Sequence, residues 1–210
     1  LMRNMLWTQR ANLMSSRNDC PLRDERFGWM GDIQAFAQTA IFQMDLAAFG
    51  TKWLQDVRDD QAADGRFPDF APHPGDPNRA FSGAPAWADA GVIVPWRLYE
   101  NYGDRRVLDE HFDAARRWVD SVARANPDLL WRERRLNDYN DWLNGDWVRQ
   151  AGWPTKGGST PNEVFATAFF AHSADLVARM AEVTGRETEA QAWSAAAELV
   201  QVGGAAAGAD

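Results

Sequence analysis

The chain has 210 residues, of which 30 are Asp or Glu and 22 are Lys or Arg, so its formal net charge is −8. Its 11 Trp and 11 Phe exclude an intrinsically disordered protein, because burial of that much apolar surface offsets the entropy lost on folding. An acidic chain without a basic stripe is a poor match for nucleic acids or anionic membrane surfaces. The longest apolar run, Ala90 to Trp96, is far shorter than the roughly 20 residues of a membrane span.

Cys20 is the single cysteine and the three histidines lie far apart in the sequence. We therefore expect no intramolecular disulfide, no metal site and no cofactor. No signal segment opens the sequence, which favours a cytoplasmic location. The chain starts at Leu1 inside a helical pattern and finishes in a Gly- and Ala-rich stretch, so we expect a piece of a longer protein.

Apolar residues repeat at helical spacing along most of the chain, and no stretch alternates for long enough to predict a strand. The predicted helices cover residues 1–14, 32–43, 46–63, 87–102, 104–122, 162–184 and 188–202. Asp104 is the expected N-cap of the fifth helix, and His111 within it is expected to pack in the core.

The connections between these helices are of two kinds. Short links near Asp45, Gly103 and Gly185 alternate with long loops over 15–31, 65–86 and 126–158. This alternation predicts an all-α fold of stacked helical hairpins, in which the long loops gather on one face. Because long loops are usually functional, we expect the site on that face.

The first long loop holds the densest cluster of ionisable groups, with four carboxylates and two arginines between Asn18 and Asp32. A carboxyl group beside an indole or a second carboxylate tends to stay protonated, whereas one that faces an arginine stays ionised. Glycoside cleavage needs carboxyl groups in both protonation states, since one neutral acid protonates the leaving oxygen while other carboxylates bind hydroxyls. On spacing alone, a solvated salt-bridge cluster from Arg23 to Arg26, with Trp29 packing the loop, remains an alternative.

Within this loop stands the string Asp19-Cys20-Pro21-x-Arg23-Asp24-Glu25-Arg26-x-Gly28-Trp29-x-Gly31-Asp32. It resembles the signature of the bacterial α-L-rhamnosidases of glycoside hydrolase family 78. The resemblance continues downstream, in the order of the family, over Trp53-Leu54-x-Asp56, Gln61-x-x-Asp64-Gly65-x-x-Pro68, Pro85-Ala86-Trp87-x-Asp89-Ala90, Pro95-Trp96, Tyr102-Gly103-Asp104 and Asp141-Trp142-Leu143.

The resemblance implies a fold. The catalytic domain of the family is an (α/α)6 barrel of twelve helices, so the seven helices predicted over 1–202 would form an incomplete barrel, followed by a Gly- and Ala-rich tail over 203–210. An incomplete barrel would expose an apolar edge. We therefore expect self-association, or a partner that supplies the remaining helices.

The resemblance also implies roles for single residues. Glu25 falls where the family has its general acid, and Asp19 and Asp32 match acidic residues that contact the hydroxyls of rhamnose. Because the family inverts the anomeric configuration, a second carboxylate must activate water. No position here matches that base, and Glu163, at a predicted helix start, is more typical of a helix-dipole partner.

Aromatic residues would complete the sugar pocket. Trp29 matches an aromatic wall. Beside these aromatic residues, Arg23 is an expected substrate contact, and so are Trp87 and Trp142. For the last two, packing at a loop–helix junction is the alternative. The family usually has Gly where this chain has Asn140, before Asp-Trp-Leu, and this departure loosens the resemblance locally.

The sequence therefore predicts hydrolysis of terminal α-L-rhamnose from a glycoside by inversion, without a cofactor, with Glu25 as the acid and the base outside this segment. Two alternatives remain open. One is an (α/α)6 glycosidase with another sugar specificity. The other is a non-catalytic fragment that binds carbohydrate or folds only with a partner.

Overall fold

The computed structural model describes residues 1–14, 16–20, 22–76, 80–132, 139–140 and 160–207, with side chains as far as Gln201. Its helices confirm the all-α class. In the described part of the chain they are α1 (Met2–Asn12), α2 (Met30–Gln43), α3 (Ala47–Asp59), α4 (Ala90–Tyr102), α5 (Arg105–Ala125), α7 (Asn162–Thr184) and α8 (Glu187–Ala207).

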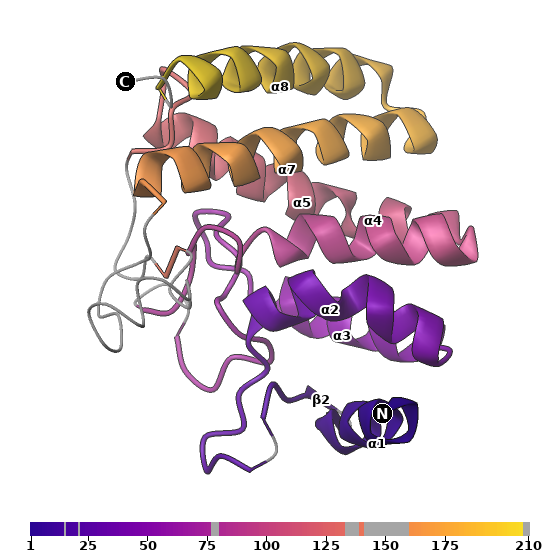
Figure 1. Cartoon of the computed structure of the whole chain (residues 1–210). Helices are drawn as coiled ribbons and strands as arrows, with labels where there is room; N and C mark the ends of the chain where they lie inside the picture. The colour runs from indigo at the N-terminus through magenta and orange to yellow at the C-terminus, as the bar shows by residue number, and fades with distance from the viewer. Residues whose placement is uncertain (15, 21, 77–79, 133–138, 141–159, 208–210) are drawn as a thin grey trace.

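Six of these helices pair into three hairpins, α2–α3, α4–α5 and α7–α8, which stack one on another (Figure 1). The short links lie on one side of the hairpins, and the described parts of the long loops lie on the opposite side, as the sequence predicts (Figure 1). Gly103 and Gly185 end α4 and α7 in the left-handed conformation, with φ of 67° and 76°. Asp104 caps α5 by accepting a hydrogen bond from the main-chain N–H of Arg106 at 3.0 Å.

The N-terminal region differs from its prediction. The helix predicted over 1–14 ends at Asn12, and the chain then forms two short antiparallel strands, β1 (Leu13–Met14) and β2 (Ser16–Arg17). The expectation of no strand was wrong here, because two-residue strands are too short to show an alternating pattern. The reversal brings Arg17 inward, where its Nη1 donates a 2.6 Å hydrogen bond to the main-chain oxygen of Trp29.

Other helix boundaries also moved. α3 ends at Asp59 instead of residue 63, and α5 continues to Ala125 instead of residue 122. α4 begins at Ala90 instead of residue 87, because the preceding residues form a turn in which the carboxylate of Asp89 accepts the N–H of Ala86 at 2.8 Å. α8 continues to Ala207, so most of the expected 203–210 tail is helical. Alanine is the best helix former, and it outweighs the glycines in this stretch.

Helix α4 lies at the centre of the core, where it packs against α2, α3, α5 and α7. His111 of α5 is fully buried there, as predicted, and burial lowers its pKa to about 3. Its Nε2 donates to the carbonyl of Gly91 at 2.7 Å, and its Nδ1 accepts from Arg58 at 3.2 Å. His111 is therefore a neutral packing residue.

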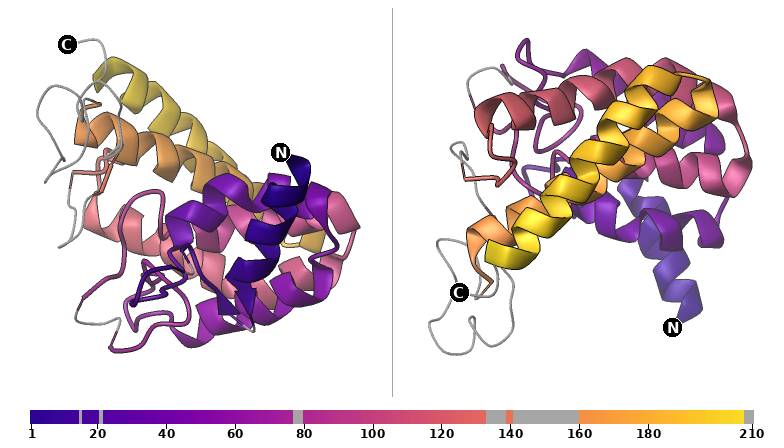
Figure 2. Two further views of the ribbon diagram at one scale, coloured as in Figure 1. Left: turned by 60° about the horizontal axis from the view of Figure 1, so that its bottom comes forward. Right: turned by 90° about the horizontal axis from the view of Figure 1, so that it is seen from above.

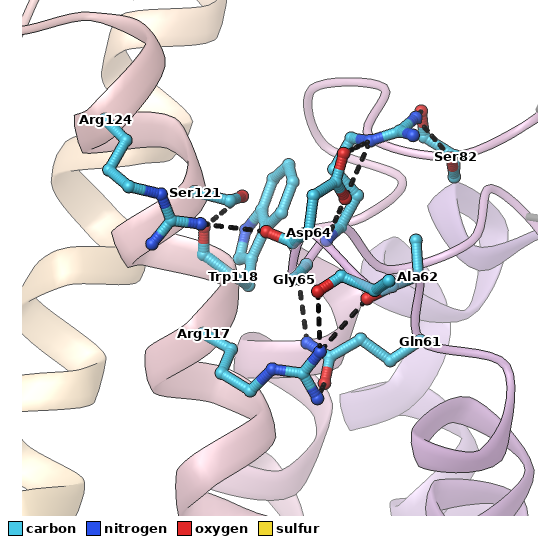
Figure 3. A network of polar contacts seen from close by, with 11 residues as sticks. Gln61, Ala62, Asp64, Gly65, Ser82, Arg117, Trp118, Ser121 and Arg124 are labelled. Atoms are coloured by element: carbon cyan, nitrogen blue, oxygen red, sulfur yellow. Dashed lines mark hydrogen bonds and ion pairs between the residues drawn. The ribbon is translucent and has the colours of Figure 1, made fainter. Parts of the chain in front are cut away.

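Helix α5 also clamps the turn that starts the second long loop (Figure 3). Arg117 donates to the main-chain oxygen of Ala62 at 3.1 Å, and Arg124 donates to that of Asp64 at 2.9 Å. Gly65 has a φ of +98°, and a Cβ atom there would lie 2.4 Å from the Arg117 oxygen. The turn therefore needs glycine, and the clamp fixes where the loop sets out.

Large apolar side chains are exposed at both ends of the stack, on α1 and α8. Trp7 is 69% exposed and Leu199 is 63% exposed. Views from two further directions show α8 lying along α7 at one end and α1 at the other (Figure 2). In the part of the chain that the structure describes, no helix combines the length and apolar character needed to cross a membrane.

Candidate active site

The long loops and the first turns of α2 and α7 enclose a cavity of about 530 Å³. All the predicted site residues in the described part of the chain line it, while Trp142 lies outside the described residues. The lining comprises Asp19, Arg23, Glu25, Trp29, Gly31, Asp32, Gln34, Ala35, Ala86, Trp87, Tyr139, Asn140, Phe165 and Phe169.

Glycine allows the carboxylate loop to lie against the second long loop. A Cβ on Gly28 would lie 2.4 Å from the main-chain oxygen of Arg17 and 2.5 Å from that of Ala71. Without a side chain there, Trp29 pairs with Phe70 in an isolated antiparallel bridge. Two loops that are far apart in the sequence are thereby locked together, and Trp29 is fixed at the cavity wall.

Glu25 and Asp19 share one arginine. Nη1 of Arg23 lies 3.6 Å from Oε1 of Glu25 and 3.7 Å from Oδ2 of Asp19. Glu25 Oε1 also accepts a 3.2 Å hydrogen bond from the indole Nε1 of Trp29. The salt-bridge cluster suggested by spacing therefore exists in part, but its carboxylates face a cavity.

Asp19 has one carboxylate oxygen to spare. Its Oδ1 is buried and has no hydrogen-bond partner. A buried acceptor without a donor is uncommon in folded proteins. Because Asp19 lines the cavity, this oxygen is suited to accept a hydrogen bond from a bound hydroxyl.

Asp32 lies in the first turn of α2 and reaches the same cavity. The protein around it displaces water and raises its pKa, with Asp19 adding to the rise and Arg17 opposing it. Arg17 is itself buried, and the loss of water lowers its pKa. The positive charge of Arg17 therefore interacts favourably with the carboxylates of both Asp32 and Asp19.

An aromatic wall stands beside the carboxylates. The Trp87 indole packs directly over Gly31, where a Cβ atom would lie 2.6 Å from the ring. The ring centroid of Tyr139 lies 4.6 Å from that of Trp87 and 5.7 Å from that of Trp29. Tyr139 donates its hydroxyl to Asp69 at 3.1 Å, and its burial, followed by that carboxylate, raises its pKa. Tyr139 is therefore a neutral, fixed wall residue.

The carboxylate of Asp89 stabilises the turn that carries Trp87. It accepts the N–H of Ala86, the indole N–H of Trp118 at 2.9 Å and the hydroxyl of Ser173 at 2.6 Å. Ala86 has a φ of +70°, a conformation that few residues other than glycine adopt. The hydrogen bonds of Asp89 stabilise this turn and thereby set the direction of Trp87.

Residues 1–203 match the family described as the bacterial alpha-L-rhamnosidase 6 hairpin glycosidase domain. The chain belongs to this family. It is 45% identical over 184 residues to an α-L-rhamnosidase of Streptomyces avermitilis, covering 88% of this chain and 16% of that protein. It is 35% identical over 198 residues to one of Formosa agariphila, covering 93% of this chain and 20% of that protein. The chain thus spans about a fifth or less of the curated relatives' length.

Solved rhamnosidases also share its fold. The Streptomyces avermitilis α-L-rhamnosidase complexed with L-rhamnose matches with a TM-score of 0.82 and 41% identity, over 97% of this chain and 18% of that one. The native enzyme of Aspergillus terreus matches with a TM-score of 0.84 and 32% identity, over 98% of this chain and 23% of that one. The predicted rhamnosidase fold is therefore confirmed.

Several lining residues of this rhamnosidase-family site were missed by the sequence analysis. Phe165 and Phe169 lie four residues apart on α7, with ring centroids 5.0 Å apart, and their helical spacing gave no sign of a cavity. Tyr139 lies in the same aromatic loop as Trp142, which was the available signal. Arg17 is not part of the lining, but its charge acts on Asp32 and Asp19. It was also missed, because it lies outside the motif that runs from Asp19 to Asp32.

Glu163 pairs with Arg132 at 3.0 Å, and it is not among the described residues that line the cavity. Within the described ranges, no group of three or more His, Cys, Asp or Glu side chains is placed to hold a metal ion. Among the described residues, the carboxylates of the cavity are Asp19, Glu25 and Asp32.

Proposed function

We propose that this chain supplies the acid-bearing part of an α-L-rhamnosidase site, which hydrolyses terminal α-L-rhamnose from glycosides with inversion. Glu25 is the general acid, and the general base lies outside this segment. The observation that carries the proposal is the cavity in which Glu25, Asp19 and Asp32 meet the aromatic wall of Trp29 and Trp87. The family to which the chain belongs supports the choice of sugar.

Each cavity residue has a role that its chemistry suits. Glu25 gives its proton to the glycosidic oxygen, while the indole N–H of Trp29 orients the carboxyl group. Asp19 and Asp32 accept hydrogen bonds from the sugar hydroxyls. The indole faces of Trp29 and Trp87 pack against the C–H groups and the methyl group of rhamnose.

The bond changes define the stereochemistry. As the bond between the anomeric carbon and the leaving oxygen breaks, that oxygen takes the proton of Glu25. Water, deprotonated by the external base, forms the new bond from the opposite face, so that the first product is β-L-rhamnose.

A binding experiment tests the sugar. Titration of the chain with L-rhamnose, L-fucose and D-mannose, followed by tryptophan fluorescence, should show the tightest binding for L-rhamnose. Asp19→Asn should weaken that binding about 10-fold, because the sugar hydroxyl then donates to a neutral oxygen instead of a charged one. Tighter binding of another sugar would contradict the rhamnose assignment.

A second experiment tests the acid. Because the base lies outside this segment, sodium azide is added as an external nucleophile, and the rhamnosyl azide formed from phenyl and p-nitrophenyl α-L-rhamnoside is measured. Glu25→Gln should slow the phenyl substrate by about 10²- to 10⁴-fold. It should slow the p-nitrophenyl substrate much less, because p-nitrophenolate leaves without a proton.

Asp24→Asn is the matched control, since Asp24 is the neighbouring carboxylate and is exposed. It should leave both rates unchanged. NMR should show the β-azide, the product of one inverting displacement. An equal loss on both substrates would argue against Glu25 as the acid. A chain that binds rhamnose but yields no azide product would instead support a non-catalytic carbohydrate-binding segment.

A further inference from the structure

Asn140 is a neutral polar residue of the cavity lining, distinct from the carboxylates. It lines the same space as Trp87 and Tyr139, yet only 2% of its surface is exposed. Its φ is +51°, in the left-handed region that asparagine tolerates better than most residues. The residue is thus held deep in the cavity wall.

The orientation of its side-chain amide follows from its neighbours. The nitrogen Nδ2 donates to the main-chain oxygen of Thr160 at 2.7 Å and also to Oδ1 of Asn162. A main-chain carbonyl can only accept, so the atom facing Thr160 must be the NH₂ group. The amide oxygen is therefore fixed on the other side.

That oxygen lacks a donor. Oδ1 of Asn140 is buried and has no hydrogen-bond partner. Buried polar atoms are almost always paired in folded proteins, so an unpaired acceptor at a cavity wall can take a hydrogen bond from a bound water or a ligand. Three aromatic residues, Trp87, Tyr139 and Phe169, line the same cavity. Such surroundings suit a neutral ring with C–H faces and hydroxyl groups.

We propose that Oδ1 of Asn140 accepts a hydrogen bond from one hydroxyl of the bound sugar, so that Asn140 is a specificity-determining residue. This inference rests on the proposed function and adds to it. Asp19 and Asp32 bind hydroxyls through charged oxygens, whereas Asn140 offers a neutral acceptor whose position is set by its contacts with the start of α7. A ligand that lacks the matching hydroxyl would leave this oxygen unpaired again.

The test compares methyl α-L-rhamnoside with its 2-deoxy, 3-deoxy and 4-deoxy analogues in binding titrations. In the unaltered chain, one analogue should lose about 3- to 10-fold in affinity through the missing partner of Asn140. Asn140→Gly, which keeps the backbone conformation accessible, should weaken methyl α-L-rhamnoside by a similar factor. For that one analogue, the difference should disappear in the variant, while the other two analogues keep theirs.

Asn162→Ala is the control for a structural effect. It removes one acceptor of Asn140 Nδ2 but leaves Oδ1, so it should lower all affinities together and keep the discrimination. If Asn140→Gly weakens every analogue by the same factor, Asn140 only supports the loop, and the inference is overturned. If the unaltered chain binds none of these sugars, the proposed function itself fails, which is a different result.

Discussion

The carboxylate of Asp89 and the carboxylates of Asp19 and Glu25 have the same chemistry but lie in different surroundings. Asp89 is completely buried, and its two oxygens accept three hydrogen bonds from Ala86, Trp118 and Ser173. Asp19 and Glu25 face a cavity, share Arg23 at more than 3.5 Å, and leave one Asp19 oxygen unpaired. The carboxylate of Asp89 is fully hydrogen-bonded within the fold, whereas that of Asp19 keeps one oxygen without a donor from the described protein.

The contrast also explains where each group lies in the hairpin stack. Asp89 stands at the start of α4, the central helix, and ties it to α5 and α7. The cavity carboxylates lie in the first long loop and the first turn of α2, on the side of the hairpins where the described parts of the long loops lie (Figure 1). Rigid hairpins thus position a site that is not itself saturated.

Replacing Asp89 should produce the largest loss of stability. Asp89→Ala leaves an indole N–H, a hydroxyl and a main-chain N–H buried without an acceptor, and should lower the free energy of unfolding by about 3 kcal/mol or more. Urea denaturation measures the loss. Asp113→Ala, whose side chain is 83% exposed, should change stability by less than about 0.5 kcal/mol. Equal effects in the two variants would contradict the structural role assigned to the hydrogen bonds of Asp89.

His111 should make the fold sensitive to acid. Its pKa is lowered from 6.5 to about 3, so the folded state resists a proton that the unfolded state binds. Its contribution to stability is present above pH 6.5 and decreases as the pH falls, by about 1.4 kcal/mol per pH unit. Stability should therefore decrease between about pH 6 and pH 4.

His111→Gln is the comparison for this pH dependence. Glutamine does not titrate, so the difference in unfolding free energy between the two proteins should shrink toward acid pH. Other groups with shifted pKa values, such as Asp89, are common to both proteins and cancel. Parallel pH profiles would show that His111 accepts its proton without unfolding the core.

Hydropathy and turn chemistry predict the hairpins well, because each signal lies within a short stretch of sequence. α7 runs from Asn162 to Thr184 as predicted, with Gly185 as its left-handed cap. The first helix was predicted to reach Met14, but Met14 lies in β1, and the apolar residues Met2 and Met5 of α1 are exposed instead of lining a core face. Periodicity reports a helical pattern, but it does not report what the helix packs against.

The site, too, has a part that a local sequence pattern predicts and a part that only the tertiary fold creates. Asp19, Glu25, Trp29 and Asp32 were predicted through a contiguous motif, and the cavity brings them together. The hydrogen bond from Tyr139 to Asp69 joins residues 70 positions apart, and the packing of Trp87 on Gly31 also depends on the tertiary fold. Such contacts have no local sequence pattern, so only the structure could reveal them.

Gly31→Ala tests the packing of that wall and should have an intermediate effect. The new Cβ would lie 2.6 Å from the Trp87 indole, so the ring must move. We expect a loss of about 1–3 kcal/mol in stability from overpacking, together with weaker sugar binding. Gly75→Ala is the control, because its Cβ would contact only the His73 ring, at 3.7 Å. Unchanged sugar binding in Gly31→Ala would show that Trp87 does not contact the ligand.

Asp32→Asn should have the smallest effect on stability, and its sign is informative. Because the folded-state pKa of Asp32 is raised, its contribution to stability is present at low pH and is lost as the pH rises through that pKa. Asparagine removes the ionisation, so the variant should be more stable at neutral pH, by less than about 1 kcal/mol after solvent screening. At a pH below the ordinary aspartate pKa the gain should vanish.

The same variant should bind L-rhamnose more weakly, because an acceptor of the cavity loses its charge. Thermal unfolding at neutral and acid pH gives the first quantity, and a rhamnose titration at neutral pH gives the second. Asp24→Asn, in the loop before α2 and outside the lining of the cavity, should change neither. A gain in stability combined with a loss of binding is expected of an open carboxylate kept for a ligand. A loss of both in Asp32→Asn would place Asp32 with Asp89, among the residues that support the fold.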